Sequence, residues 1–128
     1  MEQPTSEFKS KAGLKRIYHA SSYAIQGLAT AWRIEHSFRQ ELLVFVLAVI
    51  FAFVLPVSPF EKLVLIGVML LVLIVELINS AIEAVVDRIS LERHPLSKNA
   101  KDFGSAAVGL TILLAAITWG TVLYIRFM

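Results

Sequence analysis

The chain has 128 residues, of which 57% are hydrophobic and 17% charged, with a formal net charge of +2 and no cysteine. A soluble fold of this length cannot bury so much apolar surface, so we expect a single domain, residues 1–128, that is largely surrounded by a lipid bilayer. The absence of cysteine excludes disulfides and thiolate metal sites, and the small net charge gives no reason to expect a nucleic-acid ligand.

The N-terminal part of the chain is expected to form a surface helix. Residues 1–16 lack the short apolar core of a signal peptide, so we expect this segment to remain on the protein. At about 13–34, apolar side chains such as Leu14, Tyr18 and Trp32 share one helical face, with basic side chains away from its centre. Such a helix, directly before a span, is expected to lie on the cytoplasmic membrane surface, either as an anchor alone or also as a wall of a lipid site.

Three later segments are expected to span the membrane, at about 38–57, 62–89 and 100–126. Each has the roughly 20 residues that a helix needs to cross the hydrocarbon layer. The second is apolar only in its first half, so it can span only if its second half faces protein or water. Pro56 and Pro59 predict a tight turn between the first two spans.

The distribution of basic residues predicts the orientation. They concentrate before the first span and in the polar connection 90–101, where Ser97 is the expected helix cap. The loop between the first two spans has a single basic residue, Lys62, and the C-terminal end also has one, Arg126. By the positive-inside rule, the N-terminus and the connection are expected in the cytoplasm and the C-terminus outside.

The second expected span carries polar residues in a part of the helix where contact with lipid would be energetically unfavourable. At about 100° per residue they share one helical face: Glu76, Asn79, Glu83 and Asp87. If the helix enters near Lys62, Glu76 lies about 21 Å along it, inside a hydrocarbon layer of about 30 Å. Glu83 and Asp87 then reach the cytoplasmic boundary. Ionisable groups inside a membrane mark function by default, whereas Asn79 alone could equally serve helix packing.

Three carboxylates on one face need a cation in order to coexist. With oxygen ligands and no Cys or His in the stripe, we expect Mg²⁺ rather than Zn²⁺, completed by substrate phosphates. Glu76, the deepest, fits a general base for a hydroxyl within the bilayer, Glu83 fits metal binding, and Glu35 is a further candidate ligand. Basic residues of the connection suit the phosphates: Arg88, Arg93, Lys98 and Lys101, with His94. Small residues that open the third span are expected to allow close helix packing: Gly104, Ser105, Ala106, Ala107 and Gly109.

Two motifs, ELINSAIEAVVDRI at 76–89 and AKDFGSAAV at 100–108, follow a surface helix that ends in AWRIEHSFRQE. From about Gly13 onward, the chain resembles the prokaryotic diacylglycerol kinase family of small membrane kinases. The resemblance implies an all-α membrane protein with three transmembrane helices and an N-terminal surface helix, assembled as a homotrimer with shared active sites. It also implies transfer of the γ-phosphoryl of MgATP to diacylglycerol, giving phosphatidic acid, at the cytoplasmic face of the bacterial inner membrane, with the C-terminus in the periplasm.

The resemblance further implies roles for individual residues. Glu76 would be the general base, and Glu35 and Glu83 the metal ligands. The nucleotide would be bound by Arg16, Tyr23, Glu35, Glu83, Asp87, Glu92, Arg93, His94, Lys101 and Asp102. The lipid substrate would be contacted by Arg16, Glu76, Asn79, Ser105 and Trp119. Three residues depart from the family pattern and make the surface helix less basic: His19 replaces a lysine, and Ile25 and Gln26 replace a Trp-Lys pair.

Three alternatives remain open on the sequence alone. Undecaprenol kinases of the same family use another lipid alcohol, although the INSAIEAVVDRI form of the motif and the ITW of the third span favour diacylglycerol. A small ion or proton transporter would also carry carboxylates in the membrane, but these should then continue across the bilayer. A non-catalytic assembly subunit would leave Glu35, Lys101 and Asp102 without a role.

Overall fold

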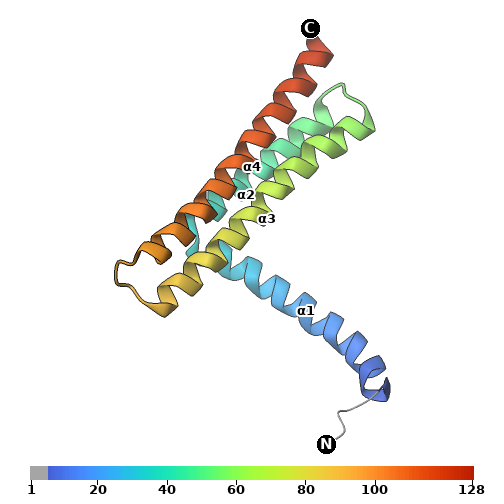
Figure 1. Cartoon of the computed structure of the whole chain (residues 1–128). Helices are drawn as coiled ribbons and strands as arrows, with labels where there is room; N and C mark the ends of the chain where they lie inside the picture. The colour runs from blue at the N-terminus through green and yellow to red at the C-terminus, as the bar shows by residue number, and fades with distance from the viewer. Residues whose placement is uncertain (1–5) are drawn as a thin grey trace, which may run out of the picture. The chain divides into compact units, whose positions relative to one another are not determined.

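The computed structural model describes the backbone of residues 6–128 and the side chains of residues 13–128, and it is all-helical as predicted (Figure 1). In this part of the chain there are four helices: α1, Ser6–Ile34; α2, His36–Val54; α3, Pro59–Ile89; and α4, Pro95–Phe127. The prediction that residues 1–16 contain no signal peptide lies partly outside the described residues.

Two compact units are described separately, α1 with Glu35 and then His36–Met128. That the whole chain forms one domain stays a prediction. In the first unit, α1 is one continuous helix with the His19 ring in contact with the rings of Tyr18 and Tyr23. Its large apolar side chains are exposed in the single chain: Leu14, Ile17, Tyr18, Leu28 and Trp32. That the membrane surface covers them stays a prediction.

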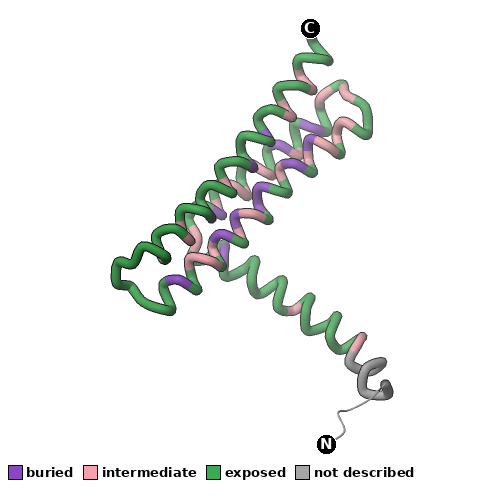
Figure 2. The backbone as a smooth tube through the Cα atoms, in the orientation of Figure 1, coloured by how far each residue is buried: buried purple, intermediate pink, exposed green. Residues whose placement is uncertain are grey.

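In the second unit, α2, α3 and α4 lie side by side, and α3 packs against both of the others (Figure 1). The α2–α3 connection and the C-terminus lie at one end of this bundle, named here the turn end, and the α3–α4 connection lies at the other, named the charged end. All three helices are long and apolar enough to cross a membrane. Most of their surface is exposed (Figure 2), and much of it carries large apolar side chains. Exposure of such an apolar surface to water is unfavourable, whereas a lipid bilayer accommodates it.

Prolines set the helix ends at the turn end. α2 stops at Val54, before the predicted residue 57, because Pro56 lacks an N–H and disfavours a helical conformation in the residue before it. α3 starts at Pro59, earlier than the predicted residue 62, with Ser58 as its cap. The Ser58 hydroxyl accepts from the Glu61 N–H at 3.1 Å, and the Glu61 carboxylate accepts from the Ser58 N–H at 3.0 Å. This capping box, with proline at the first helical position, fixes the start of α3.

A proline also starts α4, and it shifts the cap. The cap predicted at Ser97 is wrong: His94 is the capping residue, its Nδ1 accepts from the Leu96 N–H at 3.1 Å, and Pro95 follows it. Proline suits this position because its fixed φ is already helical and its missing N–H would have no partner there. α4 therefore begins five residues before the predicted residue 100, and the connection from α3 is short.

The buried face of α3 organises the bundle. Its buried residues fall at helical spacing along one side: Leu65, Val68, Val72, Leu73, Glu76, Asn79 and Val86. Toward the turn end, Val68 and Val72 form an apolar core with Ala115 of α4, and Trp119 packs against it. The Trp119 indole N–H donates to the Leu65 carbonyl at 3.2 Å. Beyond this core, the same face becomes polar.

Candidate active site

The polar stripe predicted on α3 is present, and it runs from buried to exposed toward the charged end. Glu76 is 5% exposed and Asn79 8%, Glu83 is half-buried, and Asp87 is exposed. Because Glu76 and Asn79 are buried on the same side of α3 as its apolar packing residues, they face the other helices rather than lipid. The sequence predicted that this helix can span a membrane only if its second half faces protein or water. Its two deepest polar residues meet this condition.

Asn79 of α3 lies directly against Gly104 of α4. A Cβ built on Gly104 would lie 2.1 Å from Asn79 Oδ1, so only glycine fits there with the amide in this position. Asn79 Nδ2 donates to Glu83 Oε1 at 3.4 Å, while Asn79 Oδ1 is buried without a hydrogen-bond partner among the described residues. The predicted close packing through small residues is confirmed at Gly104, whereas Gly109 has open space around it.

Glu41 of α2 is a site residue that the sequence analysis missed. Its carboxyl group lies near that of Glu76 of α3. Glu41 Oε2 is buried, and no donor among the described residues is hydrogen-bonded to it. One signal could have singled it out: Glu41 is the last charged residue before the long apolar run of α2.

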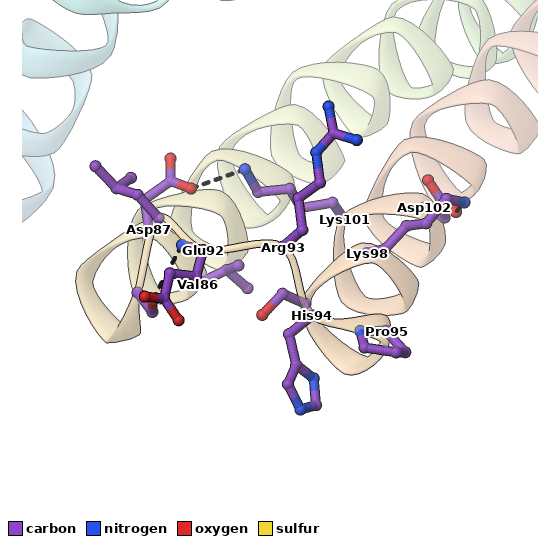
Figure 3. Close-up of a pocket in the computed structure, with 12 residues that line it drawn as sticks. Val86, Asp87, Glu92, Arg93, His94, Pro95, Lys98, Lys101 and Asp102 are labelled. Carbon is purple, nitrogen blue, oxygen red and sulfur yellow. Dashed lines mark hydrogen bonds and ion pairs between the residues drawn. The ribbon is translucent and has the colours of Figure 1, made fainter.

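A pocket of about 630 Å³ lies at the charged end, between the end of α3 and the start of α4 (Figure 3). Its volume falls within the range of about 300–1,000 Å³ that is usual for small-molecule sites. Its lining brings together most of the residues predicted to bind a nucleotide: Asp87, Glu92, Arg93, His94, Lys101 and Asp102. The geometry therefore gathers charged residues from the end of α3, the connection and the start of α4 around one cavity.

Two ion pairs line this pocket. Lys101 Nζ of α4 lies 2.7 Å from Asp87 Oδ1 of α3, as Figure 3 shows, and Lys98 Nζ lies 2.6 Å from Asp102 Oδ2 within α4. The Lys101 and Asp87 side chains remain 43% and 49% exposed. Ion pairs in this setting are weak, so each lysine can exchange its carboxylate for an anionic group of a ligand.

The connection itself adds a further cation. Glu92 N–H donates to Ser90 Oγ at 3.0 Å, which orders the turn after α3. Arg93 forms no ion pair with any residue that the structure describes. In Figure 3 its guanidinium and the His94 ring point in opposite directions from the connection. Arg93 can therefore bind a phosphate without first releasing a carboxylate.

The stripe suits a hard cation that shares its ligands with a substrate. Within residues 13–128, no three His, Asp or Glu side chains lie close enough to hold a metal by themselves. Glu83 and Asn79 offer adjacent oxygen donors, and the buried Asn79 Oδ1 has no hydrogen-bond partner in the described part of the chain. Mg²⁺ is usually held by one or two carboxylates and completed by phosphate oxygens, so this donor set fits it.

The other predicted site residues lie outside the pocket. Three belong to the α1 unit: Arg16, Tyr23 and Glu35, the last being the single residue between α1 and α2. Ser105 is exposed on α4. Trp119 is hydrogen-bonded to Leu65, and Leu65 precedes Glu76 by about 16 Å along α3. The roles of these residues stay predictions.

Together these features define an all-helical membrane protein with a buried carboxylate that is joined by a polar stripe to a charged pocket. The chain belongs to the prokaryotic diacylglycerol kinase family, whose sequence profile matches residues 22–123. It is 54% identical over 118 residues to a Pseudomonas aeruginosa protein named diacylglycerol kinase, covering 92% of this chain and 96% of that one. Proteins of the same name from Escherichia coli (strain K12) and Haemophilus influenzae are 50% and 40% identical, over 90% and 88% of this chain and 94% and 95% of their own length. The resemblance drawn from the motifs is confirmed.

Proposed function

We propose that this protein is an ATP-dependent lipid kinase that transfers the γ-phosphoryl of MgATP to the hydroxyl of diacylglycerol and so forms phosphatidic acid. Membership of the family supports a kinase with a nucleotide donor and a lipid acceptor, and the relatives named above support diacylglycerol as that acceptor. The observation that carries the proposal is the buried Glu76, set inside a membrane-spanning helix on the stripe that leads to the charged pocket.

Glu76 is the proposed general base. A lipid hydroxyl that enters from the bilayer gives its proton to the Glu76 carboxylate, and its oxygen forms the new bond to the γ-phosphorus. The bond from that phosphorus to the β–γ bridging oxygen breaks, and ADP leaves with this oxygen. Because Glu76 is buried in protein, water has little access to compete with the lipid hydroxyl.

The pocket is the proposed nucleotide site. Arg93 and Lys101 would bind phosphate oxygens there, and the phosphate chain would extend along the stripe toward Glu83. Glu83 and Glu35 would hold Mg²⁺, which neutralises charge on the phosphate oxygens when bound. Further nucleotide contacts are proposed for Arg16, Tyr23, Asp87, Glu92, His94 and Asp102, and lipid contacts for Arg16, Asn79, Ser105 and Trp119.

The proposed setting is the bacterial inner membrane, with the N-terminus and the charged end in the cytoplasm and the C-terminus in the periplasm. The concentration of basic residues before α2 and in the α3–α4 connection supports this orientation. We also propose a homotrimer with active sites shared between subunits. The exposed small residues Ala106, Ala107 and Gly109 of α4 support it, because they allow close approach of a second helix.

The test is ATP-dependent phosphorylation in mixed micelles, with diacylglycerol and undecaprenol offered separately. We expect diacylglycerol to be phosphorylated faster than undecaprenol. In Glu76→Gln the rate of phosphatidic acid formation should be about 10²–10⁴-fold lower. Glu61→Gln, a carboxylate change at the turn end that leaves the capping box intact, is the matched control and should keep full activity. If undecaprenol is phosphorylated faster, the proposed substrate changes from diacylglycerol to undecaprenol. If neither alcohol is phosphorylated, the proposed kinase function is overturned.

A second comparison separates the base from the metal ligand. Glu76→Gln should leave MgATP binding nearly intact while transfer is lost, because the base acts only on the lipid hydroxyl. Glu83→Gln should weaken MgATP binding as well. Equal loss of nucleotide binding in both variants, measured by equilibrium titration, would contradict this division of roles.

A further inference from the structure

Lys98 lines the charged pocket, but the proposed mechanism gives it no role. Its Nζ lies 2.6 Å from Oδ2 of Asp102, one helical turn later on α4, and the two side chains are 77% and 58% exposed. The Asp102 side chain forms no other hydrogen bond or ion pair with any residue that the structure describes. Its second oxygen, Oδ1, is therefore available to a ligand.

The stability of α4 does not explain a lysine at position 98. Lys98 is the fourth residue of the helix, where the partial positive charge of the helix N-terminus disfavours a cation. An ion pair at this spacing also stabilises a helix less when the basic residue comes first, as it does here. Because both side chains are exposed, water screens the pair further. The effect of Lys98 on Asp102 is therefore the feature to explain.

The pocket has to accept a polyanion although its lining is not cationic overall. It carries as many carboxylates as lysine and arginine side chains: Asp87, Glu92 and Asp102 against Arg93, Lys98 and Lys101. If Lys98 exchanged Asp102 for a phosphate, this carboxylate would remain in the same cavity without a cation and would repel the ligand. With Lys98 on Asp102, Arg93 and Lys101 still supply two cations for the phosphates.

Lys101 and Asp102 reach different parts of the pocket, because consecutive residues of an α-helix point about 100° apart. In Figure 3, Lys101 extends to Asp87 of α3, whereas Lys98 and Asp102 lie on the side of α4 away from Asp87. Phosphates held by Lys101 therefore leave Asp102 to another part of the ligand. A carboxylate only accepts hydrogen bonds, and the donor groups of ATP are the ribose hydroxyls and the amino group of the base.

We propose that Lys98 is a positioning residue: it binds Oδ2 of Asp102, offsets the charge of this carboxylate, and holds Oδ1 as the acceptor for a donor group on the nucleoside part of the nucleotide. Lys98 itself contacts no phosphate. The inference rests on the proposed function in taking ATP as the ligand, but it does not require transfer to a lipid.

The first test is equilibrium titration with ATP in mixed micelles. Lys98→Gln should raise the Kd about tenfold, as expected when a hydrogen bond to a charged group is lost. Lys98→Arg should stay within about twofold, because arginine reaches the same partner at this spacing. In an Asp102→Asn background, Lys98→Gln should have little further effect, since Lys98 acts through Asp102. Lys62→Gln, which removes a lysine at the turn end, is the control and should bind ATP normally.

Two further readouts separate positioning from a structural role. The KM for ATP should rise in Lys98→Gln while kcat stays within about twofold, because the contact is the same in the ground state and the transition state. The free energy of unfolding should not fall, because the helix N-terminus disfavours a cation at this position. A lower free energy of unfolding with an unchanged KM would show that the pair serves folding alone, and it would overturn the proposal.

Inorganic triphosphate, which has the phosphate chain of ATP without the nucleoside, tests whether Lys98 contacts phosphate. The double variant Lys98→Gln with Asp102→Asn removes one charge of each sign, so triphosphate should bind it as it binds the unmodified protein, while ATP binds about tenfold more weakly. Weaker binding of triphosphate to the double variant would make Lys98 a phosphate ligand and overturn the proposal.

Analogues of ATP that each lack one ribose hydroxyl or the amino group of the base identify the donor. The unmodified protein should bind one of them more weakly than ATP, and Lys98→Gln should lose most of this difference. Equal affinity of the unmodified protein for all of these nucleotides, or an unchanged Kd for ATP in Lys98→Gln, overturns the inference alone. If the unmodified protein binds no ATP, the proposed nucleotide site fails together with it.

Discussion

The Asn79 amide of α3 lies against the backbone of Gly104 of α4, so closely that a Cβ at position 104 would meet Asn79 Oδ1 at 2.1 Å. This contact joins the two sequence motifs that carry the family resemblance. The Asn79–Glu83 hydrogen bond and the Lys101–Asp87 ion pair lie further along the same helix pair toward the charged end. The separation of α3 and α4 at Gly104 therefore determines where several site residues lie.

Replacement of Gly104 by alanine is expected to displace the Asn79 amide. The added methyl group forces the amide to rotate, which breaks its bond to Glu83, or forces the helices apart, with a cost of about 1–3 kcal/mol. We expect lower kcat and a lower free energy of unfolding in mixed micelles, with the loss of activity the larger effect. Both quantities can be measured on the same preparation.

Two controls make this prediction specific. Gly109→Ala adds the same methyl group to α4 where there is open space, so it should change neither quantity. In an Asn79→Ala background, Gly104→Ala should have little further effect on stability, because the atom that it would meet is gone. A Gly104→Ala variant with unmodified activity and stability would show that the amide has room to move.

Much of the fold was predictable because hydrophobic length and helical periodicity encode it directly. The three apolar helices and the stripe from Glu76 to Asp87 follow from spacing within one helix. The start of α4 was not predictable in the same way, because Ser97 is a typical cap by residue type, whereas His94 caps through a ring nitrogen next to Pro95. Prolines that appear to mark turns are, at Pro59 and Pro95, the first residues of helices.

The proximity of the Glu41 and Glu76 carboxyl groups was beyond prediction from spacing. Periodicity assigns faces within a helix, but it does not determine the register in which α2 packs against α3, and that register brings the two carboxyl groups near each other. The close approach at Gly104 was easier, since a run of small residues predicts close packing on any partner. The sequence therefore indicated which residues are unusual, and tertiary packing determined which of them meet.

His94 combines a structural contact with a proposed ligand contact, and substitutions can separate the two. Asparagine is a good capping residue, so His94→Asn should keep the free energy of unfolding while raising the KM for ATP. His94→Ala should raise the KM and also lower the free energy of unfolding by about 1 kcal/mol through loss of the cap. Thermal unfolding and initial-rate kinetics measure the two effects. An unchanged KM for ATP in His94→Asn would remove this residue from the nucleotide site.

Lys101 is expected to matter for nucleotide binding far more than for stability. Its ion pair with Asp87 is partly exposed and therefore contributes little to the free energy of unfolding. A charged hydrogen bond to phosphate is stronger, so Lys101→Gln should raise the KM for ATP at least about tenfold with little change in unfolding. Arg126→Gln, a matched loss of a cation at the turn end, should leave this KM unchanged. A Lys101→Gln variant that is destabilised but binds ATP normally would contradict the assignment.

Trp119 provides the last prediction, because its indole N–H links α4 to the Leu65 carbonyl of α3 at 3.2 Å. Trp119→Phe removes this donor while keeping an aromatic ring against the core formed by Val68, Val72 and Ala115. We expect the free energy of unfolding to fall by about 0.5–1.5 kcal/mol, with the KM for diacylglycerol unchanged because the ring remains available to the lipid. Denaturant unfolding in mixed micelles and kinetics with varied diacylglycerol measure the two quantities. A raised KM at unchanged stability would mean that the indole N–H serves the lipid substrate rather than the contact between the helices.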